Sequence, residues 1–486
     1  MSHKGAIFAI LAGLCFFASA RRVQAQQAAA LAPEVREFVA VDAPVVALTH
    51  VRVVDGTGGP ARSDQTIVIS GGKISVIGDA GTVSIPAGAR TIDGANKTVI
   101  PGLVGMHDHM FYPSGGDTAV AIYNEMGFSF PRLYLAGGVT SLRTTGSLEP
   151  YTDLELKKLI DEGKLAGPKL HVTGPYIGEY GDGIPQMHTL TGPDDARRMV
   201  GYWADEGATS FKLYMRVTRA EMAAAIEEAH KRGLKITGHL CSVGFREAAA
   251  LGIDDLEHGL LVDTEFDPDK MPDVCPPDAL TEKTLAAIDV EGAAVQKTIR
   301  DLVQHHVALT STLSVFETFV PNRPPLEQRV LDAMATEPRI SYLARRAKIG
   351  ENAAKSPMSA LFKKEMEFER DFVKEGGLLL AGEDPTGYGG VLAGFGDQRE
   401  VELLVEAGFT PVEAIHIATE NGARFLGEDD QIGTLAAGKD ADLVLIDGDP
   451  SSKIADIEKV EIVFKNGVGY DSAKLIESVR GCVGLH

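Results

Sequence analysis

The sequence has little positive charge and few cysteines, and each shortage argues against a class of protein. Lys and Arg number 47 against 68 Asp and Glu, which gives a formal net charge of -21. Because nucleic acids and anionic membrane surfaces are bound through basic patches, this balance argues against both as partners. The 4 cysteines match neither a disulfide framework nor a cysteine-based zinc site.

No hydrophobic run is long enough for a comfortable transmembrane helix. The apolar run at residues 6–20 follows Lys4 and leads into small-residue cleavage sites at 18–20 and 23–25. This order is typical of a secretory signal peptide. We therefore predict that residues 1–25 are removed and that the protein is secreted or periplasmic.

Export would permit disulfides in the mature chain. Three cysteines remain there, Cys241, Cys275 and Cys482. We expect Cys275 and Cys482 to be the pair to test, with three free or buried thiols as the alternative. Cys241 lies two residues after His239 and is expected to pack there rather than to bind a metal.

The sequence also lacks a Gly-x-Gly-x-x-Gly or phosphate-loop motif, which disfavours an open nucleotide-binding sheet. Strand-like and helix-like stretches alternate between residues 101 and 430. Eight strand candidates occur there, at 98–109, 138–145, 168–176, 208–215, 233–240, 252–259, 306–315 and 376–385. Such alternation implies a parallel sheet, and eight units favour an α/β fold of the (β/α)₈ TIM barrel type. A doubly wound open sheet is the alternative.

Short Val/Ile/Thr runs separated by Gly, Asp and Asn flank this middle part, at residues 45–100 and 431–475. We predict that they meet in one small β-sandwich domain, with a linker at 26–44 and a C-terminal tail at 476–486. Two long connections, at 264–284 and 320–357, follow predicted strands and are candidate lids or specificity loops.

Ligand-type side chains recur where the predicted strands end. His107 and His109 are two residues apart, so in a strand both imidazoles point to one side. The predicted metal ligands are His107, His109, Lys212, His239, His258 and Asp384. In a barrel the carboxyl ends of the strands meet at one mouth, so these six side chains are expected to converge. Lys212 lies within an apolar strand, where an unpaired ammonium group is costly.

Several motifs together resemble the metal-dependent amidohydrolase superfamily over nearly the whole mature chain. They are DGTG at residue 55, VIPGLVGMHDH at 99, SFKLY at 210, TGHL at 237, LEHG at 256, AGEDP at 381 and GTLAAGKDADLVLIDGDP at 433. The chain looks most like the exported prolidase-like and imidazolonepropionase-like group, which includes dipeptidases and an ochratoxin hydrolase. One departure is Gly382-Glu383-Asp384, where the family usually has Gly-Thr-Asp.

The resemblance implies a subtype I binuclear site. His107, His109 and Asp384 would bind one divalent cation, and His239 and His258 the other. Carboxylated Lys212, made with carbon dioxide, would bridge the two together with a hydroxide. Zinc is the default metal for such ligands. Asp384 would act as the base, and Glu383 would support the site or face the barrel wall.

The expected activity is therefore attack of the metal-bridging hydroxide on an amide of a small-molecule substrate, such as a dipeptide, an Xaa-Pro-like dipeptide or an N-acyl amino acid. A lactone, ester, cyclic amide or phosphotriester is the alternative, and a non-enzymatic assembly protein is a third reading. Candidate substrate-binding residues are Tyr214, Arg216, Tyr176, His188 and Arg143, with ion pairing inside the barrel as the other role for Arg143. No pattern indicates an oligomeric state, and a homo-oligomer stays open.

Overall fold

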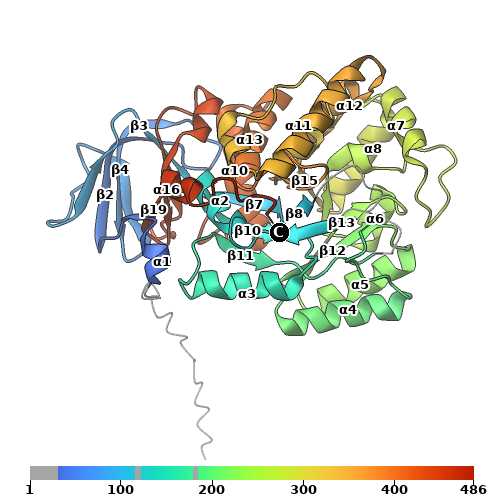
Figure 1. Ribbon diagram of the computed structural model, residues 1–486, viewed down its shortest axis with the longest axis horizontal. Coiled ribbons are helices and arrows are strands. Elements are labelled where there is room, and N and C mark those ends of the chain that lie inside the picture. The colour runs from blue at the N-terminus through green and yellow to red at the C-terminus, as the bar shows by residue number, and fades with distance from the viewer. Residues whose placement is uncertain (1–30, 115–121, 179–183, 486) are drawn as a thin grey trace, which may run out of the picture.

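The computed structural model describes residues 31–114, 122–178 and 184–485, whose arrangement is shown in Figure 1. The predicted signal peptide, residues 1–25, lies outside this part of the chain, as do the first residues of the predicted linker. Within the described ranges, no helix combines the length and the apolar character needed to cross a membrane.

One sheet joins the two ends of the chain. Its order is β1-β19-β18-β17-β6-β2-β3-β4, with β5 paired to β2. The strands are β1 (Val39–Val41), β2 (Val45–Val53), β3 (Arg62–Ser70), β4 (Lys73–Asp79), β5 (Arg90–Asp93), β6 (Thr98–Pro101), β17 (Leu443–Ile446), β18 (Val460–Lys465) and β19 (Val468–Asp471). The junction is the antiparallel pairing of β6 with β17. Because hydrogen bonds join these strands in one sheet, a sandwich of two sheets stays a prediction.

Tight turns at the predicted Gly and Asn positions make the hairpins of this sheet. Gly71 and Gly72 connect β3 to β4 with φ of 59° and 78°, and Asn466 and Gly467 connect β18 to β19 with φ of 50° and 79°. Two successive residues with positive φ define the turn whose twist suits a two-residue hairpin.

The middle of the chain is a mixed α/β unit built on parallel strands. They form two sheets, ordered β11-β10-β7 and β12-β13-β14-β15-β16. The strands are β7 (Leu103–Asp108), β10 (Val139–Thr144), β11 (Lys169–Val172), β12 (Ser210–Met215), β13 (Lys235–Leu240), β14 (Asp255–Glu257), β15 (Ala308–Ser311) and β16 (Leu379–Ala381); the hairpin β8 (Phe111–Ser114) with β9 (Ile122–Glu125) follows β7.

Backbone contacts link the outer strands of the two parallel sheets. Thr173, just after β11, makes a parallel bridge with Ser210 at the start of β12. On the other side, the amide of Asp384 after β16 donates to the carbonyl of His107 in β7 at 2.9 Å. The ends of the strands are thereby brought around a common centre.

Helices lie outside these strands, with α3 to α5 on one side and α11 to α13 on the other (Figure 1). The α-helices are α1 (Pro33–Arg36), α2 (Phe130–Gly137), α3 (Pro150–Asp161), α4 (Pro193–Glu206), α5 (Arg219–Lys231), α6 (Phe245–Leu251), α7 (Asp278–Ala287), α8 (Ala293–Gln304), α9 (Leu313–Glu317), α10 (Gln328–Ala333), α11 (Thr336–Glu351), α12 (Met358–Lys374), α13 (Phe395–Ala407), α14 (Pro411–His416), α15 (Gly422–Leu426) and α16 (Ser472–Glu477). Short 3₁₀ segments occupy Gly259–Val262 (η1), Ala353–Lys355 (η2) and Ile454–Glu458 (η4), and a π-helical segment occupies Ile417–Asn421 (η3).

Local sequence signals place the helix ends that position these strands. Thr218 and Glu221 form a capping box at the start of α5, which satisfies backbone donors of its first turn. Gly207 ends α4 with φ of 114°, and Gly252 ends α6 with φ of 94°. Glycine adopts this left-handed conformation without a steric penalty, so each helix stops just before the next strand.

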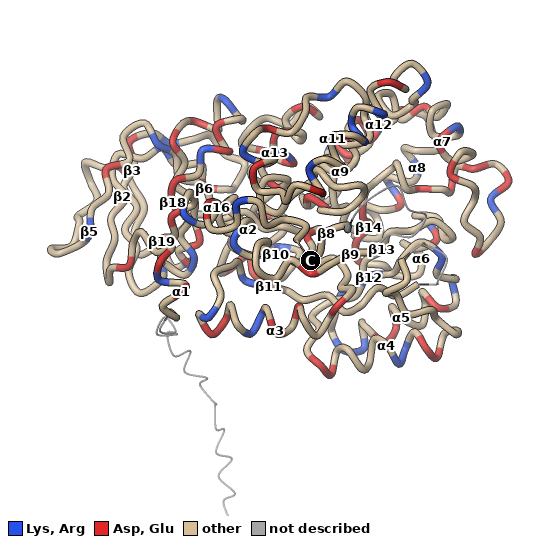
Figure 2. The backbone as a smooth tube through the Cα atoms, viewed as in Figure 1, with Lys and Arg blue, Asp and Glu red and all other residues tan. Residues whose placement is uncertain are grey.

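Apolar side chains from strands and helices pack in one large buried cluster that includes Leu142, Leu213 and Leu309. Acidic and basic residues are interleaved along outer helices such as α3 and α4 (Figure 2). Other charged side chains are buried, among them Lys212, Glu257 and Asp384, which are described below, and Glu365, Glu369 and Glu400 of α12 and α13.

The cysteine pairing differs from the expected one. The disulfide joins Cys241 to Cys275, whose Cα atoms lie 5.0 Å apart, and Cys482 is free. Cys241 follows β13, and the connection at 264–284 folds back over that strand end, which brings Cys275 within bonding reach. The expectation that Cys275 pairs with Cys482 is wrong, because Cys482 lies in the C-terminal segment, whose neighbour Val483 pairs with Met334.

Candidate metal centre and active site

Five of the six predicted ligand residues lie at or just after the carboxyl ends of parallel strands, and Lys212 lies within one. His107 is the second-to-last residue of β7, and His109 directly follows that strand. Lys212 lies in β12 and His239 in β13. His258 follows β14, and Asp384 lies three residues after the end of β16. The alternation along β7 that predicted a common direction for the two histidines accounts for their shared approach to Asp384.

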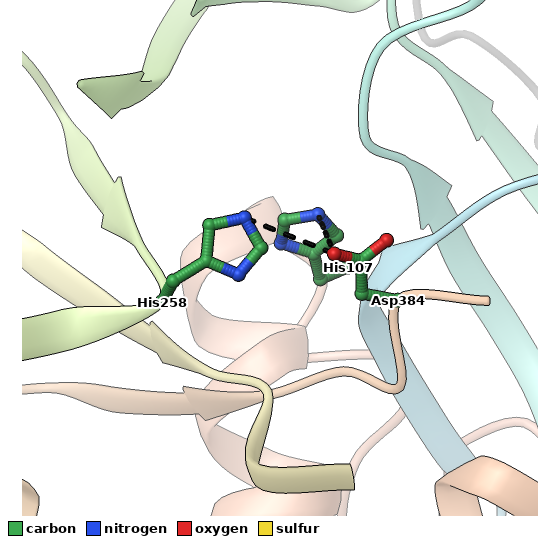
Figure 3. A group of neighbouring side chains, drawn as sticks. All are labelled: His107, His258 and Asp384. Atoms are coloured by element: carbon green, nitrogen blue, oxygen red, sulfur yellow. Dashed lines mark ion pairs between the residues drawn. The ribbon is translucent and has the colours of Figure 1, made fainter. Parts of the chain in front are cut away.

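Three of these residues form the tightest group. One ligand atom from each of His107, His258 and Asp384 lies within 4.8 Å of the others (Figure 3). Asp384 Oδ2 is 3.8 Å from Nε2 of both His107 and His258. Asp384 Oδ1 is 3.5 Å from Nε2 of His109. One carboxylate therefore faces three imidazoles at once.

Lys212 and His239 complete the cluster. Lys212 Nζ lies 3.0 Å from His107 Nε2, and the lysine is only 1% exposed. The ring of His239 stands 4.5 Å from that of His258, which in turn is 4.5 Å from that of His107. The structure thus brings together the whole predicted ligand set.

Burial controls the protonation of these groups. It lowers the pKa of His109 to about 4 and that of His239 to about 3, so both imidazoles are neutral at pH 7. Burial also lowers the pKa of Lys212 to about 8. Burial alone would raise the pKa of Asp384, but the interactions with His107, His109 and His258 hold it well below its usual value.

This donor set fits a divalent cation. Neutral imidazoles and an ionised carboxylate are the protonation states that metal binding requires. Asp384 Oδ1 is buried, accepts no hydrogen bond from the described part of the chain and faces Nε2 of His109, so its lone pairs are directed into the cluster. Hydrogen bonds from the Nδ1 side of His107 and His109 leave their Nε2 atoms available as ligands.

Two members of the cluster have strained backbones. His258 has φ of 73° and Asp384 has φ of 50°, in the left-handed region that residues other than glycine rarely adopt. Such outliers cluster at functional sites, where the surrounding structure holds them in place. In this conformation both side chains lie close to His107.

A second layer of buried charge orients His107. Glu257 Oε2 lies 2.8 Å from His107 Nδ1, and Glu257 Oε1 lies 3.0 Å from Arg143 Nη2. Arg143 also pairs with Asp255 at 3.2 Å. Burial would raise the pKa of Glu257, but Arg143 and His107 hold it well below its usual value. Glu257 is not among the residues predicted from the sequence, although it stands directly before His258 in LEHG.

Arg143 is therefore an ion-pairing residue inside the fold, the second of the two roles considered for it. The other substrate-binding candidates divide into two groups. Tyr176 and Tyr214 lie at the cluster: the Tyr176 hydroxyl is 3.4 Å from His109 Nε2, and the Tyr214 ring is 5.1 Å from that of His239. Arg216 is exposed, and His188 is half exposed and pairs with Asp195 at 3.0 Å.

Glu383 faces another group of carboxyls. Its Oε2 accepts a hydrogen bond from the amide of Asp397 at 3.1 Å. Burial, with Asp397 and Asp108 nearby, raises its pKa well above the usual value. Glu383 therefore belongs with Asp108 and Asp397 rather than with the imidazoles.

Comparison with known families matches residues 98–468 to the amidohydrolase family. This match covers more than half of the 486-residue chain. The protein therefore belongs to the amidohydrolase family, a metal-dependent family of hydrolases, and the cluster at the strand ends is its candidate metal site.

The similarity of this chain to individual proteins is consistent with membership of this family. The chain is 28% identical over 213 residues to an enamidase of Eubacterium barkeri, which covers 40% of this chain and 50% of the enamidase. It is 36% identical over 145 residues to a dihydroorotase of Trichlorobacter lovleyi, covering 29% and 32% of the two chains. These matches thus span half or less of each curated relative. A crystal structure of a Xaa-Pro dipeptidase with bound methionine in its active site has the same fold, with a TM-score of 0.66 and 20% identity over 88% of this chain and 100% of that one.

Proposed function

We propose that the protein is an exported metal-dependent hydrolase that cleaves an amide bond in a dipeptide or an N-acyl amino acid. The observation that carries the proposal is the cluster of four histidines, one lysine and one aspartate, all but His239 buried, on parallel strands of an amidohydrolase family member. The names of two similar proteins, an enamidase and a Xaa-Pro dipeptidase, support chemistry at a carbon–nitrogen bond.

Two divalent cations, most simply zinc, fit the cluster by donor type. His107, His109 and Asp384 would hold one, and His239 and His258 the other. When bound, such cations supply an activated water molecule and polarise the scissile carbonyl group.

Lys212 would link the two halves of the cluster as a carbamate. With a pKa of about 8, roughly a tenth of the amine is neutral at pH 7. The neutral nitrogen attacks the carbon of carbon dioxide and loses a proton, which produces an anionic group with two oxygen donors. This change converts a buried cation beside His107 into a ligand.

Asp384 would move the proton. Its Oδ1 accepts no hydrogen bond, and its carboxylate is ionised at neutral pH because of the neighbouring histidines. It can take a proton from the attacking water and then donate it to the leaving nitrogen. Tyr176 stands beside His109, where its hydroxyl can contact a bound substrate.

A cyclic amide is the second candidate substrate. It is favoured by the similarity to a dihydroorotase, since dihydroorotate is itself a cyclic amide. Both candidates use the same residues and differ only in whether the leaving nitrogen stays attached to the product.

The proposal also includes a closed barrel architecture and an exported location for the protein. We infer that the two parallel sheets close into one (β/α)₈ barrel, supported by the bridge from Thr173 to Ser210 and the hydrogen bond from Asp384 to His107. Export is supported by the pattern of residues 1–25 and by the Cys241–Cys275 disulfide, since such bonds persist in oxidising compartments.

The first experiment combines metal analysis of the mature protein with a screen of dipeptides, N-acyl amino acids and cyclic amides. We expect about two metals per chain and turnover of one amide class. His239→Ala should lose activity and bound metal, whereas His188→Ala should lose neither. Full metal content without turnover of any amide would overturn the assignment of the bond, and one metal or none would overturn the binuclear site.

A further inference from the structure

An apolar pocket opens beside the metal cluster. Its volume is about 330 Å³, and His239 forms part of its wall. His239 is the one ligand histidine whose side chain is not fully buried, because this pocket reaches it. A group bound here would therefore lie next to the reacting atoms.

The pocket is lined mainly by apolar side chains from distant parts of the chain. Phe316, from α9, packs at 5.8 Å from the ring of His258 and closes one side. The other apolar walls include Leu240, Leu261, Phe319 and Met358. Apolar lining and a volume of this size leave room for a substituent as large as a phenyl or medium-length alkyl group.

The charge of the pocket lining limits which substrate groups can bind there. Among the residues that the structure describes, the lining includes neither Lys nor Arg, and its charged members are the exposed Asp278 and Glu282. A substrate carboxylate would find no cation here and would meet acidic groups at the rim. The pocket therefore favours an uncharged apolar group.

One wall is held by the disulfide. The connection at 264–284 contributes Thr264, Pro276 and Thr281 to the lining. Cys241, itself part of the lining, bonds to Cys275 next to Pro276, and Thr264 Oγ1 donates to the carbonyl of Cys241 at 2.5 Å. The connection is therefore tied to the strand end that carries His239, two residues away.

We propose that this pocket selects substrates with an apolar substituent next to the scissile amide, and that the Cys241–Cys275 disulfide positions the pocket wall. The proposal rests on the proposed amide hydrolysis and names its substrate class. Binding a phenyl or medium-length alkyl group would displace water from the pocket and place the amide at the metal cluster.

Met358 allows a clean test, because it is partly exposed in the pocket wall and is the first residue of α12. A glutamate at a helix N-terminus is favourable for the helix dipole, so Met358→Glu should fold. Met358→Leu is the matched control, since it keeps an apolar side chain of similar volume.

The substrates are N-acetylglycine, N-phenylacetylglycine, N-octanoylglycine, N-succinylglycine and N-acetylphenylalanine, which vary the group on either side of the amide. We expect kcat/KM at least about tenfold higher for one apolar series than for N-acetylglycine, with N-succinylglycine the poorest. Met358→Glu should lower kcat/KM for the apolar series by at least about fivefold more than it lowers kcat/KM for N-acetylglycine, with metal content retained. An unchanged preference in Met358→Glu, or the same loss in Met358→Leu, would overturn the pocket assignment.

The disulfide is tested by Cys275→Ser, with Cys482→Ser as control because Cys482 is free. The preference for apolar substrates should fall several-fold through KM in Cys275→Ser only, with metal content retained. Equal preference in both variants would refute the positioning role.

Failure of the hydrolase proposal can be recognised separately. If fully metallated protein turns over no amide, octanamide binding is measured by calorimetry on the wild type and Met358→Glu. Binding to the wild type alone would support the pocket without the reaction, and binding to neither would overturn the pocket itself.

Discussion

Replacing Glu257 with glutamine removes one negative charge from the layer behind the metal cluster. The carboxylate stands 2.8 Å from His107 Nδ1 and 3.0 Å from Arg143, and both neighbours keep it ionised. A glutamine offers one oxygen and one amino group at this position, so it can accept from His107 or from Arg143 but not from both.

Two effects determine how much metal affinity and folding stability Glu257→Gln should lose. Loss of a carboxylate that orients a metal-binding histidine typically costs 10–100-fold in metal affinity or activity. Breaking a buried ion pair leaves Arg143 with less compensation and costs a few kcal/mol of folding stability, up to about 3–5 kcal/mol. Asp255 remains 3.2 Å from Arg143, and loss of the repulsion from Glu257 favours its ionised form, which limits this loss.

Asp255→Asn is the matched control. Asp255 contacts the same arginine but makes no hydrogen bond to His107. Burial, reinforced by repulsion from Glu257, raises the pKa of Asp255 to about 8, so its carboxyl is mostly neutral at pH 7 and an amide replaces it closely.

The assay is metal affinity by competition with a chelator, together with thermal unfolding of the metal-free protein. We expect Glu257→Gln to lose at least about tenfold in affinity and Asp255→Asn to stay within about threefold. Equal affinities for Glu257→Gln and the wild type would refute the role given to the His107 contact.

Three further predictions concern the ligands. Asp384→Asn should keep much of the bound metal, because the histidines remain, but lose turnover by at least about a hundredfold; metal analysis and kinetics on one sample check both, and an active variant would contradict the base role. Lys212→Ala should lose activity that added short carboxylic acids partly restore, and full activity without them would rule out the bridge. The metal-free protein should lose stability as pH falls from about 6.5 to about 4, because unfolded histidine binds a proton in this range whereas folded His109, with a pKa of about 4, does not. For His109 the expected loss is about 3 kcal/mol of unfolding free energy. Unfolding free energy is measured against pH for the wild type and His109→Gln, and a flat dependence in the wild type would contradict the prediction.

The convergence of the ligand residues could be predicted because it depends on local rules. The spacing of His107 and His109 sets a common direction in a strand, and the ends of parallel strands share one edge. Lys212 is an isolated lysine in an apolar strand, and a buried ammonium group there requires a compensating interaction. Each of these signals is contained within a few residues of sequence.

The parts that could not be predicted depend on contacts between distant segments. Arg143 and Glu257 are 114 positions apart, and no local pattern indicates their pairing. The Cys241–Cys275 disulfide depends on how the connection at 264–284 folds back, which charge and turn residues alone do not define. The apolar pocket likewise exists only where five or more segments meet.

The pairing of β6 with β17 has a consequence for the order in which the chain can fold. Val99 and Leu445 are partners across 346 positions, so β2, β3 and β6 can complete their sheet only after almost the whole chain has been made. At about 5–20 residues per second, the intervening segment takes roughly 20–70 s to synthesise. During that time the unpaired edge of β6 is open to aggregation, and a shielding chaperone during biosynthesis should raise the yield of folded protein.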